Sequence, residues 1–178
     1  MADQWKSITT VRVLPHDPAW KDEYHREAQK LREILDDEIS EIHHIGSTSV
    51  PGLPAKPVID ILIGVRKIED IDRYNDAMVR AGYEARGEYG IPGRRFFTKG
   101  IPERTHNVHI FQADDPGFKR HLNFRDYLIA HQDSAQKYGE LKKALAGTCE
   151  NDLDRYCDGK DAFVKETEKK AIEWAKNR

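Results

Sequence analysis

A glycine turn followed by three hydroxyl residues is the segment of this sequence best suited to bind an anion. Gly46 follows a predicted short strand over residues 42–45, and it allows a sharp turn with close approach of backbone N–H groups to a phosphate. Ser47, Thr48 and Ser49 then supply hydroxyls that can hydrogen-bond phosphate oxygens. Because the same residue types are common in ordinary turns, composition alone fits either a phosphate-binding corner or a structural turn.

Asp60 is a carboxylate inside the apolar run 58–65, which has the β-branched composition of a buried strand. An isolated charge there is costly, so it must be paired, hydrogen-bonded or bound to a metal. One interpretation is an ion pair with Lys56, Arg94 or Arg95. The interpretation that we favour is a functional carboxylate that holds a cation or a polar substrate.

Two histidines are candidates to join this carboxylate. His109 shares a strand face with Asn107 and Phe111, and His44 lies just before the glycine turn. Asp60, His109 and His44 would make a workable set of divalent-metal ligands if the fold brought them together. The alternative for each histidine is a hydrogen-bonded structural role.

Basic residues supply the candidate anion contacts. Lys56 follows the turn, Arg95 and Lys99 share one face of a predicted strand, and Arg125 lies on a predicted helix. Any of the four can reach an anionic ligand, and the alternative is solvated surface charge.

The elements that must position these residues follow from hydrophobic periodicity and turn residues. Strands are predicted at 11–14, 42–45, 58–65, 83–89, 94–99 and 107–112. Helices are predicted from Asp17–Pro18 through about residue 35, from Ile68 to a stop at Gly82, and over 117–131, 134–146 and 152–176. This order predicts an α/β (α+β) fold, with a mixed sheet, packed helices and a helical C-terminal part.

Length and composition restrict the class of protein. The 178 residues suit a single domain over 1–178. Lys plus Arg (29) nearly balance Asp plus Glu (31), so bulk nucleic-acid binding is not expected. The longest apolar run, 58–65, is far short of the ~20 residues of a membrane span. Residues 1–6 lack the apolar region of a secretory signal, and Cys149 and Cys157 suit free thiols, so a cytoplasmic location is expected.

Residues 44–61 closely resemble the signature of the GrpB family. The resemblance continues through 105–109, 124–128 and 138–142, and it extends over roughly residues 10 to 175. The family is placed in the nucleotidyltransferase superfamily with a DNA polymerase beta-like core, and GrpB-like domains also occur fused to dephospho-CoA kinases. The resemblance therefore implies a nucleotidyltransferase-like sheet and a nucleotide or other phosphorylated small molecule as ligand.

The resemblance also assigns roles to the site residues. In the superfamily, a Gly-Ser pair ends one strand, and an Asp-x-Asp or Asp-x-Glu pair follows on the next. Gly46-Ser47 matches the first element and Asp60 the first carboxylate, but Leu62 stands in place of the second. Mg or Mn is the expected metal, and a histidine ligand would shift the preference towards Zn or Ni.

Three functions remain open from the sequence. In a metal-dependent nucleotidyltransferase, Asp60 and His109 would bind the metal, while Lys56 and Arg95 would stabilise developing charge. A non-catalytic module for nucleotides or CoA precursors is the alternative favoured by Leu62. A metal-dependent hydrolase built on Asp60, His44 and His109 ranks last, since no clear general base is evident.

Overall fold

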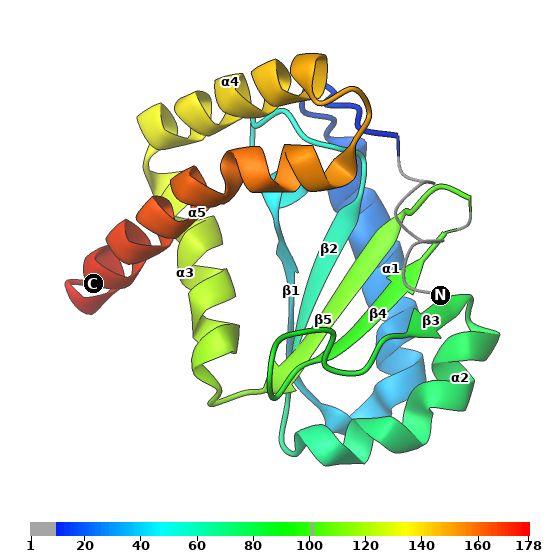
Figure 1. Ribbon diagram of the computed structural model, residues 1–178. Helices are drawn as coiled ribbons and strands as arrows, with labels where there is room; N and C mark the ends of the chain where they lie inside the picture. The colour runs from blue at the N-terminus through cyan, green and yellow to red at the C-terminus, as the bar shows by residue number, and fades with distance from the viewer. Residues whose placement is uncertain (1–9, 101) are drawn as a thin grey trace.

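A mixed sheet with helices on both faces organises the computed structural model, which describes residues 10–100 and 102–178 (Figure 1). The strands are β1 (Ile39–Ile45), β2 (Ile59–Val65), β3 (Tyr83–Ala85), β4 (Arg95–Lys99) and β5 (His106–Gln112). The α-helices are α1 (Ala19–Leu35), α2 (Asn75–Arg80), α3 (Pro116–Ala130), α4 (Gln132–Thr148) and α5 (Leu153–Lys176). Short 3-10 turns are η2 (Asp36–Glu38), η3 (Ser47–Ser49) and η4 (Ile68–Tyr74).

The strand order across the sheet is β1-β2-β5-β4-β3. β2 and β5 run parallel, and the other neighbouring pairs are antiparallel. The apolar run of β2 has one partner on each side and helices over both faces. The predicted central, doubly covered strand is therefore confirmed.

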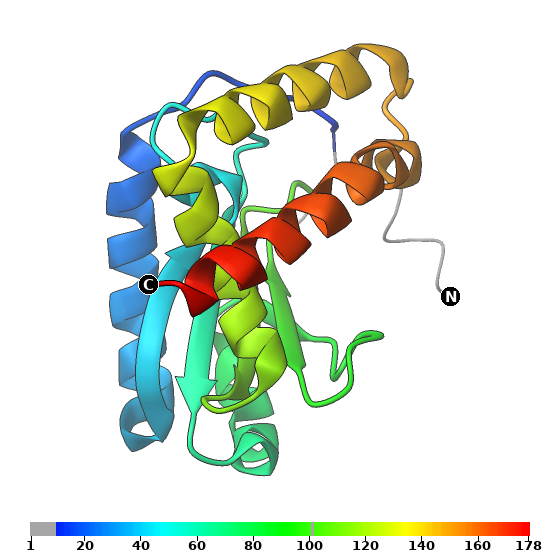
Figure 2. The same ribbon diagram turned by 90° about the vertical axis from the view of Figure 1, so that its left-hand side faces the viewer.

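Strand alternation divides the core into two layers. Ile59, Ile61 and Ile63 pack with the apolar stripe of α1, which runs from Trp20 to Leu35. The opposite face of β2 carries Asp60, Leu62 and Gly64. On that face Leu62 packs against side chains of β5 and α3. Figure 2 shows α1 on one side of the sheet and α3 and α5 on the other.

The C-terminal helices form a helical part above the sheet, as predicted (Figure 1). Tyr138 of α4 stacks on Phe163 of α5 at a centroid distance of 4.9 Å. α5 begins after Asp152, whose side chain accepts hydrogen bonds from two backbone N–H groups in the first turn. The mixed sheet, the packed helices and this helical part confirm the predicted fold class.

Several predicted boundaries were wrong. Residues 11–14 form no strand, because among the described residues their one ladder contact is an isolated bridge between Leu14 and Ala55. The strand predicted over 83–89 ends at Ala85, and a turn with Gly87 and Gly90 at positive φ follows. The helix predicted from Ile68 is a 3-10 helix as far as Tyr74; α2 follows it and ends at Arg80, close to the predicted stop at Gly82.

Two further predictions concern membranes and secretion. Within residues 10–100 and 102–178, no helix has the length and apolar character needed to cross a bilayer. The expectation about residues 1–6 lies outside the described residues.

Candidate functional site

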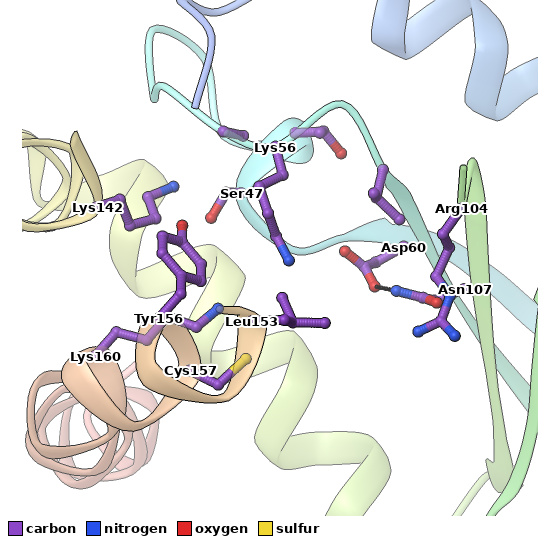
Figure 3. A pocket seen from close by; sticks show the side chains of 13 residues that line it. Ser47, Lys56, Asp60, Arg104, Asn107, Lys142, Leu153, Tyr156, Cys157 and Lys160 are labelled. Atoms are coloured by element: carbon purple, nitrogen blue, oxygen red, sulfur yellow. Dashed lines mark hydrogen bonds between the residues drawn. The ribbon is translucent and has the colours of Figure 1, made fainter. Parts of the chain in front are cut away.

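A cavity of about 270 Å³ lies where η3 and the start of β2 face the first turns of α5 (Figure 3). Its lining is mainly polar and cationic, with several apolar walls. The lining residues are Ser47, Thr48, Ala55, Lys56, Val58, Asp60, Arg104, Asn107, Lys142, Leu153, Tyr156, Cys157 and Lys160. We call this space the Lys56 cavity.

Asp60 is the one carboxylate in this lining, and its side chain is 26% exposed. Its Oδ1 accepts a hydrogen bond from Asn107 Nδ2 at 3.0 Å and lies 3.4 Å from His109 Nε2. Burial opposes ionisation, but the hydrogen bonds from His109 and Asn107 and the charge of Lys56 outweigh it and lower the pKa of the Asp60 carboxyl. Asp60 is therefore held as an anion that faces the cations of the cavity.

The tautomer of His109 is set by Arg94. Arg94 Nη1 lies 3.3 Å from His109 Nδ1, and a guanidinium can only donate, so Nδ1 accepts and the proton of the neutral ring is on Nε2. That Nε2–H points to Asp60 Oδ1. Arg94 is itself fixed by hydrogen bonds to the backbone carbonyls of Glu88 and Tyr89. His109 thus donates to the carboxylate through the same nitrogen that a shared metal would need.

Gly46 makes the close approach of the turn to Asp60 possible. Its φ is 72°, and a Cβ at this position would lie 2.6 Å from Asp60 Oδ2. The register of β1 against β2 pairs Ile45 with Asp60, so the turn begins directly beside the carboxylate. Ser49 Oγ donates to the Gly46 carbonyl at 2.5 Å and closes the turn.

Two lysines of the cavity, Lys56 and Lys160, place their ammonium groups over the same aromatic ring. Lys56 Nζ and Lys160 Nζ lie 5.2 and 5.0 Å from the ring centroid of the buried Tyr156. Burial lowers the pKa of the Lys56 ammonium, and the charge of Lys160 lowers it further. Neither ammonium has an ion pair with a carboxylate of the described chain.

Lys142 and Arg104 complete the set of cations. Lys142 is 1% exposed, and its Nζ donates to the carbonyl of Pro54. Burial, with the charges of Lys160 and Lys56, lowers the pKa of Lys142 to about 7. Burial also lowers the pKa of Arg104, which reaches the cavity from the connection between β4 and β5. Four cations therefore face one carboxylate in this space.

Three of the predicted residues lie on the opposite face of the sheet. His44 pairs with Ile61 and stacks on Tyr24 of α1 at 4.8 Å. Lys99 forms an ion pair with Glu27 of α1 at 2.5 Å, and Arg95 binds Asp72 through two nitrogens. Strand alternation is the physical reason, because Asp60 and these three side chains leave the sheet on different sides. They do not reach the Lys56 cavity, contrary to the sequence-based expectation.

Two more predicted contacts are used elsewhere. The Ser49 hydroxyl is committed to the Gly46 carbonyl. Arg125 pairs with Asp126 and donates from Nη1 to the His44 carbonyl at 3.1 Å. Ser47, Thr48, Lys56 and Asp60, by contrast, line the cavity as expected, and Gly46 lies directly against Asp60.

A resident metal does not fit these side chains. Of the three predicted ligands, His44 is on the far face and His109 directs an N–H at Asp60. Across the part of the chain that the structure describes, no three His, Cys, Asp or Glu side chains form a group able to hold a metal ion. Leu62, at the position of the second carboxylate, is fully buried in the apolar layer under α3.

Comparison of the sequence and the structure with known proteins shows which family this chain belongs to. The sequence model described as GrpB protein matches residues 10–170. The crystal structure of the conserved protein GrpB from Enterococcus faecalis is 45% identical and superposes with a TM-score of 0.89, covering 92% of this chain and 99% of that one. The chain belongs to the GrpB family. The resemblance of the glycine turn and the Asp60 strand to the GrpB signature is therefore confirmed.

Other relatives are longer than this GrpB-family chain. YqkA of Bacillus subtilis (strain 168) is 43% identical over 168 residues, which cover 94% of this chain and 49% of YqkA. A dephospho-CoA kinase of Mycolicibacterium paratuberculosis is 28% identical over 190 residues, covering 93% of this chain and 47% of the kinase. The chain thus spans about half the length of these two relatives.

Sequence reasoning missed two of the cavity lysines on the C-terminal helices of this GrpB-family chain. A signal for both was present. Lys142 follows Tyr138 by four residues, and Lys160 follows Tyr156 by four, so each lysine lies within an apolar helical stripe. A lysine in a buried stripe needs a polar or anionic partner, which marks it as a site candidate.

Proposed function

We propose that the Lys56 cavity binds a nucleotide or another phosphorylated small molecule. The observation that carries this proposal is the convergence of Lys56, Arg104, Lys142 and Lys160 around one carboxylate. These four cations come from four separate segments of the chain. Lys56, Arg104 and Lys160 are each more than 40 residues from one another in sequence. Such convergence is produced by the tertiary fold and not by a local run of charge.

The electrostatics of the cavity favour an anionic ligand. Burial lowers the pKa values of Lys56, Arg104 and Lys142, and the nearby charge of Asp60 only partly offsets this effect for Lys56 and Arg104. A phosphate group among them would supply the missing counter-charge through charge-assisted hydrogen bonds. Ser47 and Thr48 line the same space; the Thr48 hydroxyl lies 2.9 Å from His44 Nε2, which leaves the Ser47 hydroxyl as the candidate to orient phosphate oxygens.

The family context favours a nucleotide-like ligand and a binding role. Relatives of this chain include proteins named dephospho-CoA kinase, which makes a CoA precursor a natural candidate beside ATP and GTP. Leu62 occupies the position of the second carboxylate, and its full burial supports binding over metal-dependent transfer. The expected place of action is the cytoplasm, with no bulk binding of nucleic acid.

Isothermal calorimetry with ATP, GTP, CoA, dephospho-CoA and inorganic pyrophosphate tests this proposal. We expect saturable binding of at least one of them and roughly tenfold weaker binding by Lys160→Ala, because one charge-assisted hydrogen bond contributes about 1.5–3 kcal/mol. Lys165→Ala is the matched control, since Lys165 is on the same helix but exposed and paired with Asp161. Absence of binding to all five ligands at millimolar concentration, or equal weakening in both variants, would overturn the proposal.

Nucleotidyl transfer is a second candidate, favoured by the ionised Asp60 that faces the cavity (Figure 3). An assay of nucleotide turnover tests this activity. The wild type and Asp60→Asn are each given ATP, GTP, CTP and UTP in the presence of Mg, Mn, Zn or Ni salts. Turnover that disappears in Asp60→Asn supports transfer. Turnover that is equal in both proteins, or absent in the wild type despite nucleotide binding, restricts the chain to binding.

A further inference from the structure

A second hollow lies on the other side of η3 from the Lys56 cavity. Its volume is about 410 Å³, which is within the ordinary range for small-molecule pockets. It is enclosed by α1, the end of β1, η3 and α3. The lining residues are His16, Pro18, Lys21, Tyr24, His25, His44, Thr48, Ser49, Pro51, Arg125 and Ile129. We call it the His44 pocket.

Flat rings form one wall of the His44 pocket. The Tyr24 and His44 rings are parallel within 8° at 4.8 Å, and the His25 ring lies 5.1 Å from Tyr24. Burial lowers the pKa of His44 to about 4, although Asp60 acts in the opposite direction, so its ring is neutral at pH 7. Neutral, parallel aromatic faces favour stacking with another planar ring.

The charged groups that line the pocket are cations. No acidic residue is among the lining residues, whereas Lys21 and Arg125 both are. Arg125 forms an ion pair with Asp126, and Lys21 is exposed at the rim. His16 adds a buried Nδ1 that has no hydrogen-bond partner in the structure. A buried polar atom of this kind is rare in a folded protein, and a ligand in the pocket can satisfy it.

We propose that the His44 pocket is a second binding site, for a planar aromatic molecule that carries an anionic group such as a carboxylate, sulfonate or phosphate. The ring would lie against the Tyr24–His44 wall and Ile129, and the anion would face Lys21 and Arg125. The site is distinct from the Lys56 cavity, because His44 and Asp60 leave the sheet on opposite faces and Thr48 is the one residue that lines both spaces.

Fluorescence titration with 8-anilinonaphthalene-1-sulfonate tests this site, because the dye is a flat aromatic sulfonate. We expect one saturable site on the native protein, with displacement by naphthoate but weak displacement by cyclohexanecarboxylate or naphthalenemethanol. Excess inorganic pyrophosphate should leave the dye bound, which separates this pocket from the Lys56 cavity.

A pair of surface variants locates the dye. Ile129 lines the pocket and is 40% exposed, and Ile172 on α5 is 41% exposed and outside it. Ile129→Glu should weaken dye binding roughly tenfold or more, because it adds a like charge beside the sulfonate. Ile172→Glu should leave it unchanged. No saturable dye binding, equal effects of the two variants, or equal displacement by all three competitors would refute the proposal.

Discussion

At the scale of single residues, the charge and position of Asp60 depend on three neighbours. Asn107 and His109 direct N–H groups at its Oδ1, and Gly46 leaves room for its Oδ2. Arg94 contacts His109 and not Asp60; by donating to His109 Nδ1 it keeps the ring proton on Nε2, which faces Asp60. The carboxylate is therefore held in one orientation, ionised, beside the lysines of the cavity.

Replacement of Gly46 tests how closely the turn approaches this carboxylate. A side chain at positive φ costs about 1–2 kcal/mol, and a Cβ at 2.6 Å from Asp60 Oδ2 adds about 1–3 kcal/mol of overpacking. Gly52 has a similar φ of 76° but nothing within 4 Å of the added atom. In urea unfolding, Gly46→Ala should lose more stability than Gly52→Ala. Equal losses would contradict the close approach.

Leu62 has a structural role in this chain. Its side chain is fully buried and packs with Ile45, Phe111 and Phe118. A carboxylate at this position would be placed in the apolar layer under α3 and would have to be paired to be tolerated. Position 62, where the resemblance led us to expect a second carboxylate, therefore belongs to the core of this chain.

At the scale of elements, α5 supplies one whole wall of the Lys56 cavity. Its first turns carry Leu153, Tyr156, Cys157 and Lys160, all of which line the space. The helix begins at Asp152, whose Oδ1 accepts from the N–H groups of Asp154 and Arg155 at 2.9 and 3.2 Å. The cap thus fixes the part of α5 that lines the Lys56 cavity.

Removal of this cap should destabilise the protein modestly. Asp152→Ala leaves two N–H groups of the first turn without their acceptor, and the expected loss is about 1 kcal/mol in chemical unfolding. Asp152→Asn keeps a capping oxygen and should remain within a few tenths of a kcal/mol of the wild type. A loss of similar size in both variants would show that charge, and not capping, is the effect.

At the scale of the whole molecule, a buried polar group joins α1 to the far strands of the sheet. Glu27, 3% exposed, accepts from Tyr83 Oη of β3 at 2.7 Å and from Lys99 Nζ of β4 at 2.5 Å. Burial opposes ionisation of Glu27, but the hydrogen bonds from Lys99 and Tyr83 prevail and lower its pKa to about 2. The carboxylate therefore stabilises the folded chain while it is charged.

The pH dependence of stability should report this group. Because the folded pKa is depressed, the contribution of Glu27 is complete above about pH 5 and is lost as the pH falls towards 2. The shift corresponds to roughly 3 kcal/mol. The difference in unfolding free energy between the wild type and Glu27→Gln should shrink by about that amount between pH 5 and 2. A difference that stays constant over this range would contradict the role given to Glu27.

The hydrophobic pattern and local motifs of the sequence were enough to predict most of the helices, the central strand and part of the candidate site. The α1 stripe, the apolar run of β2 and the three C-terminal helices could each be predicted, because each depends on residues close together in sequence. The Gly46 turn and Asp60 could also be recognised as a site. The segment at 11–14 could not be assigned correctly, since strand formation needs a partner that composition does not reveal.

Tertiary structure decided which of the other charged side chains join Asp60 at the cavity. Strand register and alternation sent His44, Arg95 and Lys99 to the α1 face and left Asp60 on the other. The packing of α4 and α5 above the sheet brought in Lys142 and Lys160 from far along the chain. Sequence determined which segments form strands and helices, because those depend on local periodicity. Tertiary structure decided which charges meet, because that depends on which face each side chain leaves and which helix covers it.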